Sequence, residues 1–242
     1  MNERQNLIIP MAVLGIAIII AVFIFTNAWT ASRNANMTLN VTGSAKMDLV
    51  SDLGMLSGSL SVQAATKASA YRALQNMKPG LIEYFARKGF PEDKLEWEPE
   101  NSYANYDYDN NGRQMGIRSW TYRQRVRIQS EDVHKIKEIS LDISKLVERG
   151  IYFDVESPEF HYTKLAEVKQ QVQAMAAKDA MLRAEKIAEA TGRKLGPMRA
   201  GRMGVLQITP RNSTMVSDYG VNDVSSIDKE ITAVVSGDFQ LE

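Results

Sequence analysis

The sequence predicts an α+β protein in which an N-terminal apolar helix precedes a mixed domain of strands and helices. Three observations indicate this. Leu7–Phe25 is an uncharged apolar run of membrane-spanning length. Downstream, several stretches alternate polar and apolar residues, as half-buried strands do. Between them lie helical patterns that end at glycine. The 242 residues suffice for one large or two small domains.

The N-terminal apolar run is longer than the core of a secretory signal, which spans about 7–15 residues. The following TNAWTASRNA matches a small-x-small cleavage site poorly, and Trp29 suits a membrane interface. We therefore expect residues 1–27 to be an uncleaved transmembrane anchor, with a cleaved signal as the alternative. Residues 28–36 are predicted to be a linker. The simplest topology places the short N-terminus inside the cell and residues 37–242 outside it.

Residues 37–242 are expected to form the extracytoplasmic domain, with the order β-β-α-β-β-α-β-α-β-β. The predicted elements are strands near 37–44 and 53–63, a helix near 67–88, strands near 94–103 and 116–129, a helix near 130–149, a strand near 151–161, a helix near 163–191, and strands near 199–209 and 230–241. The portion from residue 53 to 161 follows the ferredoxin-like, split-βαβ order. Thr66 is a helix cap, and Pro79 predicts a kink or break in the helix that follows.

The middle hairpin allows a prediction of register. Asn111-Gly112 is a strong signal for a two-residue type I′ turn. With that turn, three acids at period two meet three arginines at period two. The predicted pairs are Glu96–Arg127, Glu98–Arg125 and Glu100–Arg123, with Leu95–Ile128 and Trp97–Val126 on the opposite face. Pro99 indicates an edge or a bulge.

Composition and charge exclude several function classes. The formal net charge is +0, from 29 basic and 29 acidic residues, whereas nucleic-acid binders normally carry a basic excess or face. Arg123, Arg125 and Arg127 form the one candidate basic row, and the predicted register neutralises it. We therefore expect no nucleic-acid partner. The chain has no cysteine, which excludes disulfides, thiol catalysis and cysteine-ligated zinc.

Local motifs point to no metal, cofactor or catalytic residue. DYDNNG at 107–112 resembles half of a calcium loop, but Arg118 occupies the position that needs a bidentate glutamate. His134 and His161 lie in no metal-ligand spacing, and no G-x-S-x-G elbow is present. GRKLGPMRAGRMG lacks the GK[ST] ending of a phosphate loop, so we interpret it as a helix end followed by a strand. The prediction is a protein without catalytic, cofactor-binding or metal-binding residues, and not an enzyme.

The segment AMAAKDAMLRAEKIAEATGRKLGP, residues 174–197, predicts a helix closed by Gly192. Its candidate packing face recurs at three- and four-residue steps. That face comprises Ala174, Ala177, Met181, Ala184 and Ala188. Small side chains permit close approach of another backbone. We expect this face to pack on its own sheet, with a seam between subunits as the alternative.

With these segments in view, the chain resembles the SIMPL-domain family, which includes bacterial periplasmic immunogenic and oxidative-stress-defence proteins. The resemblance spans about Leu39 to Phe239. It is carried by LNVTGSAKMDLVSD, TKASAYRALQNMKPGLIEYFARKGFPEDKLEWE, YRQRVRIQSEDVHKI, LVERGIYFDVESPEF and AAKDAMLRAEKIAEATGRKLGP. The family's usual VTGxGxV start is VTGSAKM here. The resemblance implies an extracytoplasmic α+β fold and large ring- or barrel-like homo-oligomers. It brings no active site.

These observations lead to two hypotheses of different class. The first is a single-pass inner-membrane protein, mostly periplasmic, that self-assembles and has a structural or envelope- and stress-related role. Its expected partners are itself and the lipid bilayer. The second is a small-ligand binder or enzyme whose site forms only in the assembled fold.

Overall fold

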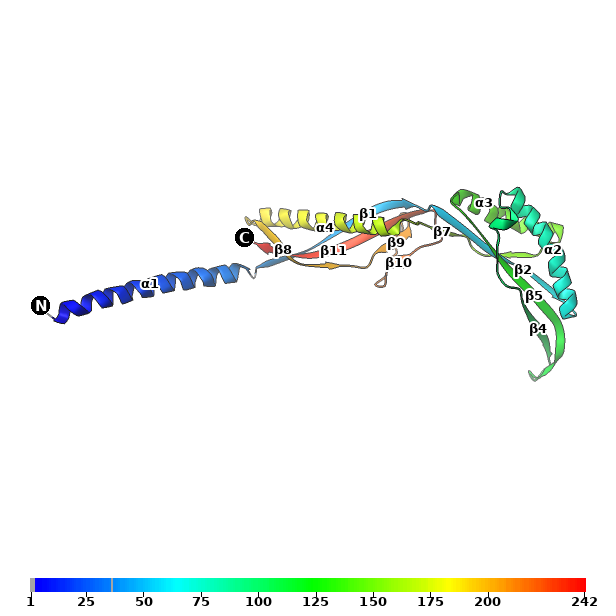
Figure 1. The fold of residues 1–242 in the computed structure, drawn as a ribbon, viewed down its shortest axis with the longest axis horizontal. Helices are drawn as coiled ribbons and strands as arrows, with labels where there is room; N and C mark the ends of the chain where they lie inside the picture. Colours follow the sequence, from blue (N-terminus) through cyan, green and yellow to red (C-terminus); the bar gives the residue numbers. More distant parts are fainter. Residues whose placement is uncertain (1–2, 36) are drawn as a thin grey trace. The chain divides into compact units, whose positions relative to one another are not determined.

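The computed structural model of the chain describes residues 3–35 and 37–242 (Figure 1). It has an α+β fold in which an N-terminal apolar helix precedes a sheet-rich body. The chain forms two compact units. Unit 1 comprises residues 1–47, 166–207 and 232–242, and unit 2 comprises residues 48–165 and 208–231.

The N-terminal helix α1 spans Glu3–Ala35. Its segment Met11–Trp29 is long and apolar enough to cross a membrane, and none of that segment is buried. A signal sequence has the same properties. The predicted linker, residues 28–36, is helical up to Ala35. Asn36 lies outside the described residues.

The six-stranded sheet of unit 2 is built on two long antiparallel strands, β2 (Leu53–Ala64) and β5 (Gln114–Ser130). They pair without interruption from Gly54 opposite Ser130 to Ala64 opposite Trp120. Four shorter strands flank them. β3 (Glu96–Trp97) and β4 (Asn101–Tyr108) pair with β5, while β6 (Phe153–Val155) and β7 (Glu159–His161) pair with β2.

Two helices cover the apolar face of this sheet and form the core of unit 2. They are α2 (Lys67–Arg87) and α3 (Val133–Asp142), with the short helices η1 (Glu92–Lys94) and η2 (Ile143–Arg149) beside them. Thr66 caps α2, as predicted, through a capping box with Ser69. Of the kink or break predicted at Pro79, the break is absent, because α2 is one helix from Lys67 to Arg87. Its neighbour Gly80 leaves room for Ile151, because an added Cβ would lie 2.6 Å from Ile151 Cδ1.

The hairpin register is confirmed near its base and wrong further out. Glu96 pairs with Arg127 and Trp97 with Val126, and the Glu98 N–H donates to the Arg125 carbonyl at 3.0 Å. Beyond Pro99 the register moves by one residue, so that Asn101 rather than Glu100 faces Arg123. The Glu100 side chain instead accepts a hydrogen bond from Gln75 of α2 at 2.6 Å. Proline cannot donate to the ladder, which accounts for the shift at that point.

The hairpin turn also differs from the prediction. The Asp109 N–H donates to the Arg113 carbonyl, and the Gly112 N–H donates to the Asp109 carbonyl. Gly112 has φ +77°, whereas Asn111 does not have a positive φ. A two-residue type I′ turn needs a positive φ at both central residues. The observed turn therefore has three loop residues with only the glycine left-handed.

Unit 1 packs the long helix α4 (Leu165–Ala190) along β1 (Thr38–Val50) and β11 (Asp228–Leu241) (Figure 1). β8 (Leu195–Met203) pairs antiparallel with β11. The sheet order is β1-β11-β9-β10, where β9 is Gln207–Pro210 and β10 is Val221–Asn222. The chain passes from one unit to the other within β1, at the start of α4, and within β9 and β11.

The packing face of α4 is only partly the predicted one. The buried residues recur at every fourth position: Val168, Val172, Ala176, Ala180, Ala184 and Ala188. Ala184 and Ala188 are confirmed, whereas Ala174 and Met181 are exposed. Ala180 and Ala184 cluster with Val41 of β1 and Phe239 of β11, so this face packs on its own sheet.

Candidate functional site

The open face of the unit 2 sheet carries the main polar network of that unit. Alternation along β2 places Leu56 and Leu60 in the core and Ser57 and Ser59 on the opposite face. Along β5, Val126 and Ile128 are buried, and the arginines of the predicted basic row alternate with them. The same period-two pattern that builds the core therefore concentrates polar groups on one face.

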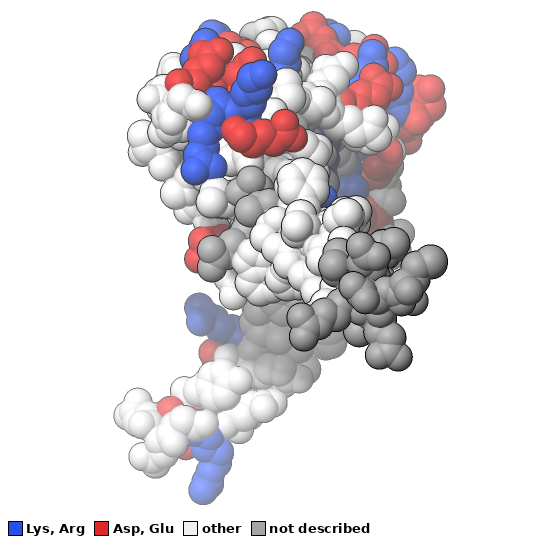
Figure 2. All heavy atoms as spheres, turned by 90° about the vertical axis from the view of Figure 1, so that its left-hand side faces the viewer, with Lys and Arg blue, Asp and Glu red and all other residues white. Residues whose placement is uncertain are grey.

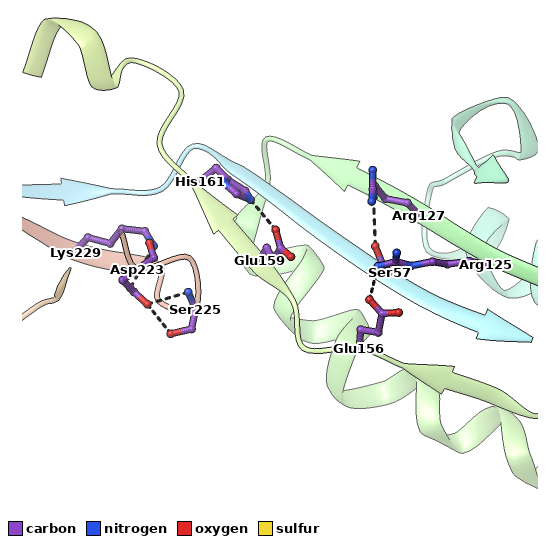
Figure 3. A network of polar contacts seen from close by, with 9 residues as sticks. All are labelled: Ser57, Arg125, Arg127, Glu156, Glu159, His161, Asp223, Ser225 and Lys229. Carbon is purple, nitrogen blue, oxygen red and sulfur yellow. Dashed lines mark hydrogen bonds and ion pairs between the residues drawn. The ribbon is translucent and has the colours of Figure 1, made fainter. Parts of the chain in front are cut away.

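Arg125 lies at the centre of this network (Figure 3). Its guanidinium forms an ion pair with Glu98 at 3.6 Å and a second, hydrogen-bonded pair with Glu156, from the segment between β6 and β7. Beside it, Arg127 Nε donates to the Ser57 hydroxyl at 3.3 Å. The predicted Glu98–Arg125 pair is thus present, and Glu156 is a partner that sequence spacing did not reveal.

Two hollows on this face share Glu156, one lined by Arg127 and the other by Arg125. The larger, about 280 Å³, is lined by Ser59, Glu98, Pro99, Asn101, Arg123, Arg125 and Glu156. The Ser59 hydroxyl and Arg125 Nε are buried and have no hydrogen-bond partner among the described residues. The lining contains two arginines and two glutamates, so its charges compensate. This composition favours neither an anionic nor a cationic ligand.

Among the described residues, neither histidine is hydrogen-bonded through its ring to a nucleophilic side chain. His161 Nε2 is 3.1 Å from Glu159 Oε2 on the same strand, β7, and that pair is largely solvent-accessible (Figure 3). His134 is exposed on α3. A histidine–carboxylate pair can orient an imidazole, but general-base catalysis needs a substrate or nucleophile within hydrogen-bond reach. In the described part of the chain the pair makes a local hydrogen bond within β7.

A buried ion pair joins the loop between β10 and β11 to the start of β11, in a region that the sequence marks only as a loop. Lys229 is 2% exposed, and its Nζ donates to the Asp223 carbonyl at 2.5 Å and lies 3.3 Å from Asp223 Oδ2. Asp223 also accepts hydrogen bonds from the Ser225 N–H at 2.9 Å and hydroxyl at 2.6 Å, and from the Ser226 N–H at 3.2 Å. The DxSS spacing at 223–226 was the available signal for this turn.

Burial and hydrogen bonding act in opposite directions on this pair. Burial by itself raises the pKa of Asp223, but the bonds from Ser225 and Ser226 and the Lys229 charge outweigh it and lower that pKa to about 2. Burial also lowers the pKa of Lys229, against the opposing attraction of Asp223. Both groups are satisfied by each other and by the loop, so this pair fixes the loop rather than offering a reactive amine.

A second polar cluster joins α2 to α3 at the edge of the core. The Tyr84 hydroxyl donates to Asp142 Oδ2 at 3.2 Å, and Asp142 also lies 2.9 Å from Lys145 and 3.3 Å from Lys88. Hydrogen bonds from Lys145 and Lys88 lower the pKa of Asp142 to about 2. Burial, followed by the Asp142 charge, raises the pKa of Tyr84. The phenol therefore stays protonated and acts as a donor.

A third cavity, of about 630 Å³, opens where α2 meets η1 and α3. It is lined by Leu53, Gly89, Phe90, Asp93, Lys94, Glu96, Gln129, Ser130, Glu131 and Lys135. The Lys135 ammonium lies 5.2 Å from the centre of the Phe90 ring. Its lining combines three acids with two lysines and so has no excess of positive charge.

The remaining sequence motifs have structural positions. In DYDNNG, Asp109 Oδ1 accepts from the Asn111 and Arg113 N–H groups, which uses the carboxylate to close the hairpin turn. Gly192 has φ +70° and ends α4, as predicted. Over residues 3–35 and 37–242 no group of three or more His, Asp or Glu side chains could hold a metal ion. Figure 2 shows basic and acidic side chains intermixed on the face in view, without a patch of one sign.

Comparison with known proteins identifies the relatives of this chain. The sequence model of SIMPL, described as a protein of unknown function (DUF541), matches residues 39–239. The chain belongs to the SIMPL family. The matched region runs from β1 to β11, so the SIMPL domain includes both sheets and α4. The resemblance inferred from the sequence segments is thereby confirmed.

No curated protein matches this SIMPL chain. Among solved structures, the de novo designed protein Foldit4 has a TM-score of 0.19 and 13% identity, over 42% of this chain and 93% of that one. A proposed amidohydrolase/peptidase from Burkholderia cenocepacia has a TM-score of 0.23 and 13% identity, over 50% of this chain and 29% of that one. Both TM-scores are too low to indicate a shared fold.

Proposed function

We propose that this SIMPL protein is a membrane-anchored, extracytoplasmic protein that assembles with copies of itself and has a structural or envelope- and stress-related role. The observation that carries the proposal is the span Met11–Trp29 of α1, which is apolar, long enough to cross a bilayer and wholly unburied. An exposed apolar helix of this length is stable in lipid and costly in water. The short N-terminal side is proposed to lie in the cytoplasm, with the SIMPL domain outside the inner membrane.

Several anchors on one assembly would reinforce each other. Each α1 would contribute its own membrane attachment, and linked attachments bind more tightly than isolated ones by raising the effective concentration of the next. Attachment to one membrane also concentrates the SIMPL domains near each other, which favours weak domain contacts. This makes a homo-oligomer of a tethered domain more stable than the same domain contacts in solution.

The experiment uses full-length protein in membranes. Alkaline carbonate washing should leave the wild type in the pellet, and intact mass should show that residues 1–36 are retained. A variant with Ile18→Arg and Ile19→Arg should be released, because each arginine at the centre of a membrane helix costs about 2.5–3.5 kcal/mol. A matched control places two arginines at exposed Leu141 and Tyr152 and should remain in the pellet. A mature chain that lacks α1 would contradict the anchor.

Assembly and topology have separate readouts. Light scattering of the detergent-extracted wild type should give a mass of several chains, and a monomer at all concentrations would contradict self-assembly. Protease added to intact spheroplasts should digest the SIMPL domain if it lies outside the membrane. Full protection would contradict the proposed orientation.

The ferredoxin-like description of residues 53–161 is also part of the proposal. It rests on the predicted β-α-β-β-α-β order and on the pairing of β2 between β5 and β6. A high-resolution experimental structure with another strand order would replace it.

A second candidate function is a small-ligand site, or an enzyme, that is complete only in the assembly. The observation that favours it is the buried and unpartnered pair of polar atoms, Ser59 Oγ and Arg125 Nε, beside the 280 Å³ hollow. Buried polar groups are normally hydrogen-bonded. The test is to screen small molecules for those that raise the thermal stability of the wild-type oligomer. A molecule that stabilises the wild type but not Ser59→Ala would support this alternative. Equal stabilisation of the wild type and Ser59→Ala would exclude the hollow as the site.

A further inference from the structure

β4 provides a free strand edge. Within the part of the chain that the structure describes, Asn101–Tyr108 pairs with β5 on one side and with no strand on the other. Half of its backbone N–H and C=O groups therefore point away from the sheet. Such an edge is a template for pairing with another chain.

The other outer segments of this sheet are shorter than β4 and lie next to prolines, whereas β4 is long and its only irregularities are two register shifts against β5, after Asn105 and after Asp107. β6 and β7 have three residues each and are separated by Pro158, while β3 has two residues and is followed by Pro99. Short strands and prolines are common means of blocking edge pairing. β4 has eight residues, NSYANYDY, with no proline, lysine or arginine. An exposed edge of this length is thus a specific feature of β4.

The hairpin also extends beyond the helix that covers the sheet. The first residue of α2, Lys67, lies over the Trp120 ring at 5.5 Å, and Tyr71 contacts Tyr122 edge-on at 5.6 Å. Ala104 lies opposite Trp120, and residues directly opposite in an antiparallel pair share a face. Tyr106, two residues further along β4, therefore continues the helix-covered face at a point that α2 does not reach.

The uncovered end of the hairpin carries four exposed aromatic or large apolar side chains. Tyr106 is 40% exposed and Tyr108 63%, and on β5 Ile117 is 51% exposed and Met115 70%. Exposed aromatic and large apolar side chains next to an unpaired strand edge are typical of an interaction surface. We name β4 together with Met115 and Ile117 the β4 edge.

The sequence of β4 fits a second copy of itself. In an antiparallel pair about a two-fold axis, residues that face each other point to the same side, so odd positions face odd positions and even face even. Two registers then pair nearly all of β4, centred on Ala104 or on Asn105. Asp107, the only charged residue of β4, faces the partner's Asn101 in the first and the partner's Tyr103 in the second. Neither register places like charges opposite each other.

We propose that the β4 edge is the seam at which a second copy of this chain pairs with the first, strand to strand and antiparallel. The inference rests on the proposed self-assembly and names its contact. Pairing would satisfy the outward backbone groups of both copies. It would also place Tyr106 of one copy opposite the partner's Ser102 or Ala104, which covers part of an exposed tyrosine ring. Because a two-fold seam only makes pairs, a larger assembly needs a second contact elsewhere.

The absence of cysteine makes the seam directly testable. In full-length protein in membranes, Ala104→Cys or Asn105→Cys would introduce a single thiol. If the register is centred on the substituted residue, the Cα atoms of the two cysteines in the paired copies would lie about 4.5–5.5 Å apart. Oxidation or a short bifunctional thiol reagent should then produce covalent homodimers for at least one of the two variants. Met181→Cys, at a site on α4 that is 50% exposed and so at least as accessible to the reagent as Ala104 or Asn105, is the control and should give few.

A second variant tests the energetics without a crosslink. Tyr106→Lys with Tyr108→Lys should raise the protein concentration needed for assembly by about tenfold, because it removes apolar contacts and places four added charges at the seam. The control is Leu141→Lys with Tyr152→Lys, at comparably exposed sites of unit 2. Circular dichroism should show that both variants remain folded.

The outcomes separate this inference from the proposed function. A wild type that is monomeric in detergent contradicts self-assembly itself. A wild type that assembles, but whose β4 variants assemble equally well and form no homodimer crosslinks, overturns the seam and leaves self-assembly standing. Crosslinks from Ala104→Cys and Asn105→Cys to a different protein, without homodimers, also overturn it, since the edge would then bind another partner.

Discussion

Gly43 of β1 is expected to be the position in unit 1 that least tolerates a side chain. A Cβ at this residue would lie 2.7 Å from Ala180 Cα and closer still to the Ala180 nitrogen and the Ala176 carbonyl oxygen. All three atoms belong to the backbone of α4, so no side-chain rotation relieves the contact. The Ser44 N–H also donates to Asp179 at 2.9 Å, which holds β1 against α4 at this point.

The size of the effect follows from this geometry. To reach ordinary van der Waals separation, α4 would have to move away from β1 by roughly 1 Å along a face of buried alanines. Overpacking a tightly packed site typically costs about 1–3 kcal/mol, and more where backbone must move. We therefore expect Gly43→Ala to lower the free energy of unfolding of unit 1 by about 3 kcal/mol.

Urea unfolding followed by circular dichroism would measure this loss, and hydrogen exchange would locate it in α4. The matched control is Gly116→Ala in β5, because an added Cβ there has no atom within 4 Å and the change should be within about 0.5 kcal/mol. Ala180→Gly should not rescue Gly43→Ala, since the contact is with backbone. Equal urea midpoints for Gly43→Ala and the wild type would refute the reasoning.

Three further predictions concern charged groups. Asp223→Asn should destabilise unit 2 by about 3 kcal/mol in urea, because the Lys229 charge is left buried, and Lys229→Met should cost less because the carboxylate keeps its loop hydrogen bonds. The pKa of Asp223 in the folded protein, about 2, lies below its ordinary 3.8, so the stability that this carboxylate contributes should be complete above pH 3.8 and be lost as pH falls toward 2. Parallel stability profiles of the wild type and Asp223→Asn over that pH range would contradict this prediction. Asp142→Asn should lower the pKa of Tyr84 toward 10.0 in an ultraviolet titration, with Tyr84→Phe identifying the signal, and an unmoved titration would show that burial alone raises it. Arg125→Met should reduce stability by about 1 kcal/mol at low salt and by less at high salt, because two carboxylates lose the cation between them and salt screens that attraction; equal losses at both salt concentrations would argue against this electrostatic cause.

The hairpin shows how far local patterning predicts the fold. Three acids and three arginines at period two were enough to place Glu96 opposite Arg127 and Glu98 opposite Arg125. The third pair was wrong because the ladder shifts by one residue at Pro99. The proline predicted an irregularity at this point but not the direction of the shift. Glu156, the second partner of Arg125, comes from a distant strand connection, and no local pattern contains such a contact.

The alanine helix shows a different limit. Its existence and its end at Gly192 follow from local signals, but alanine occurs around the helix at positions 174, 176, 177, 180, 184 and 188. A residue with so little side chain gives weak contrast between a buried and an exposed face. The face is decided by Gly43, where β1 approaches the backbone of α4. That glycine lies in the VTG of the family start, and its tertiary meaning is visible only in the structure.

The pairing of β1 with β11 has a consequence for how this chain folds. Asn40 donates to Asp238 at 2.6 Å, and these residues are 198 positions apart in the chain. Contacts of such long range must overcome a large loop-closure entropy, and domains rich in them fold slowly. β2, α2 and β5, in contrast, are close in sequence and can come together early. We therefore expect the part of unit 2 built from β2, α2 and β5 to form first, while β1 remains an unpaired strand that is prone to aggregation until β11 reaches it.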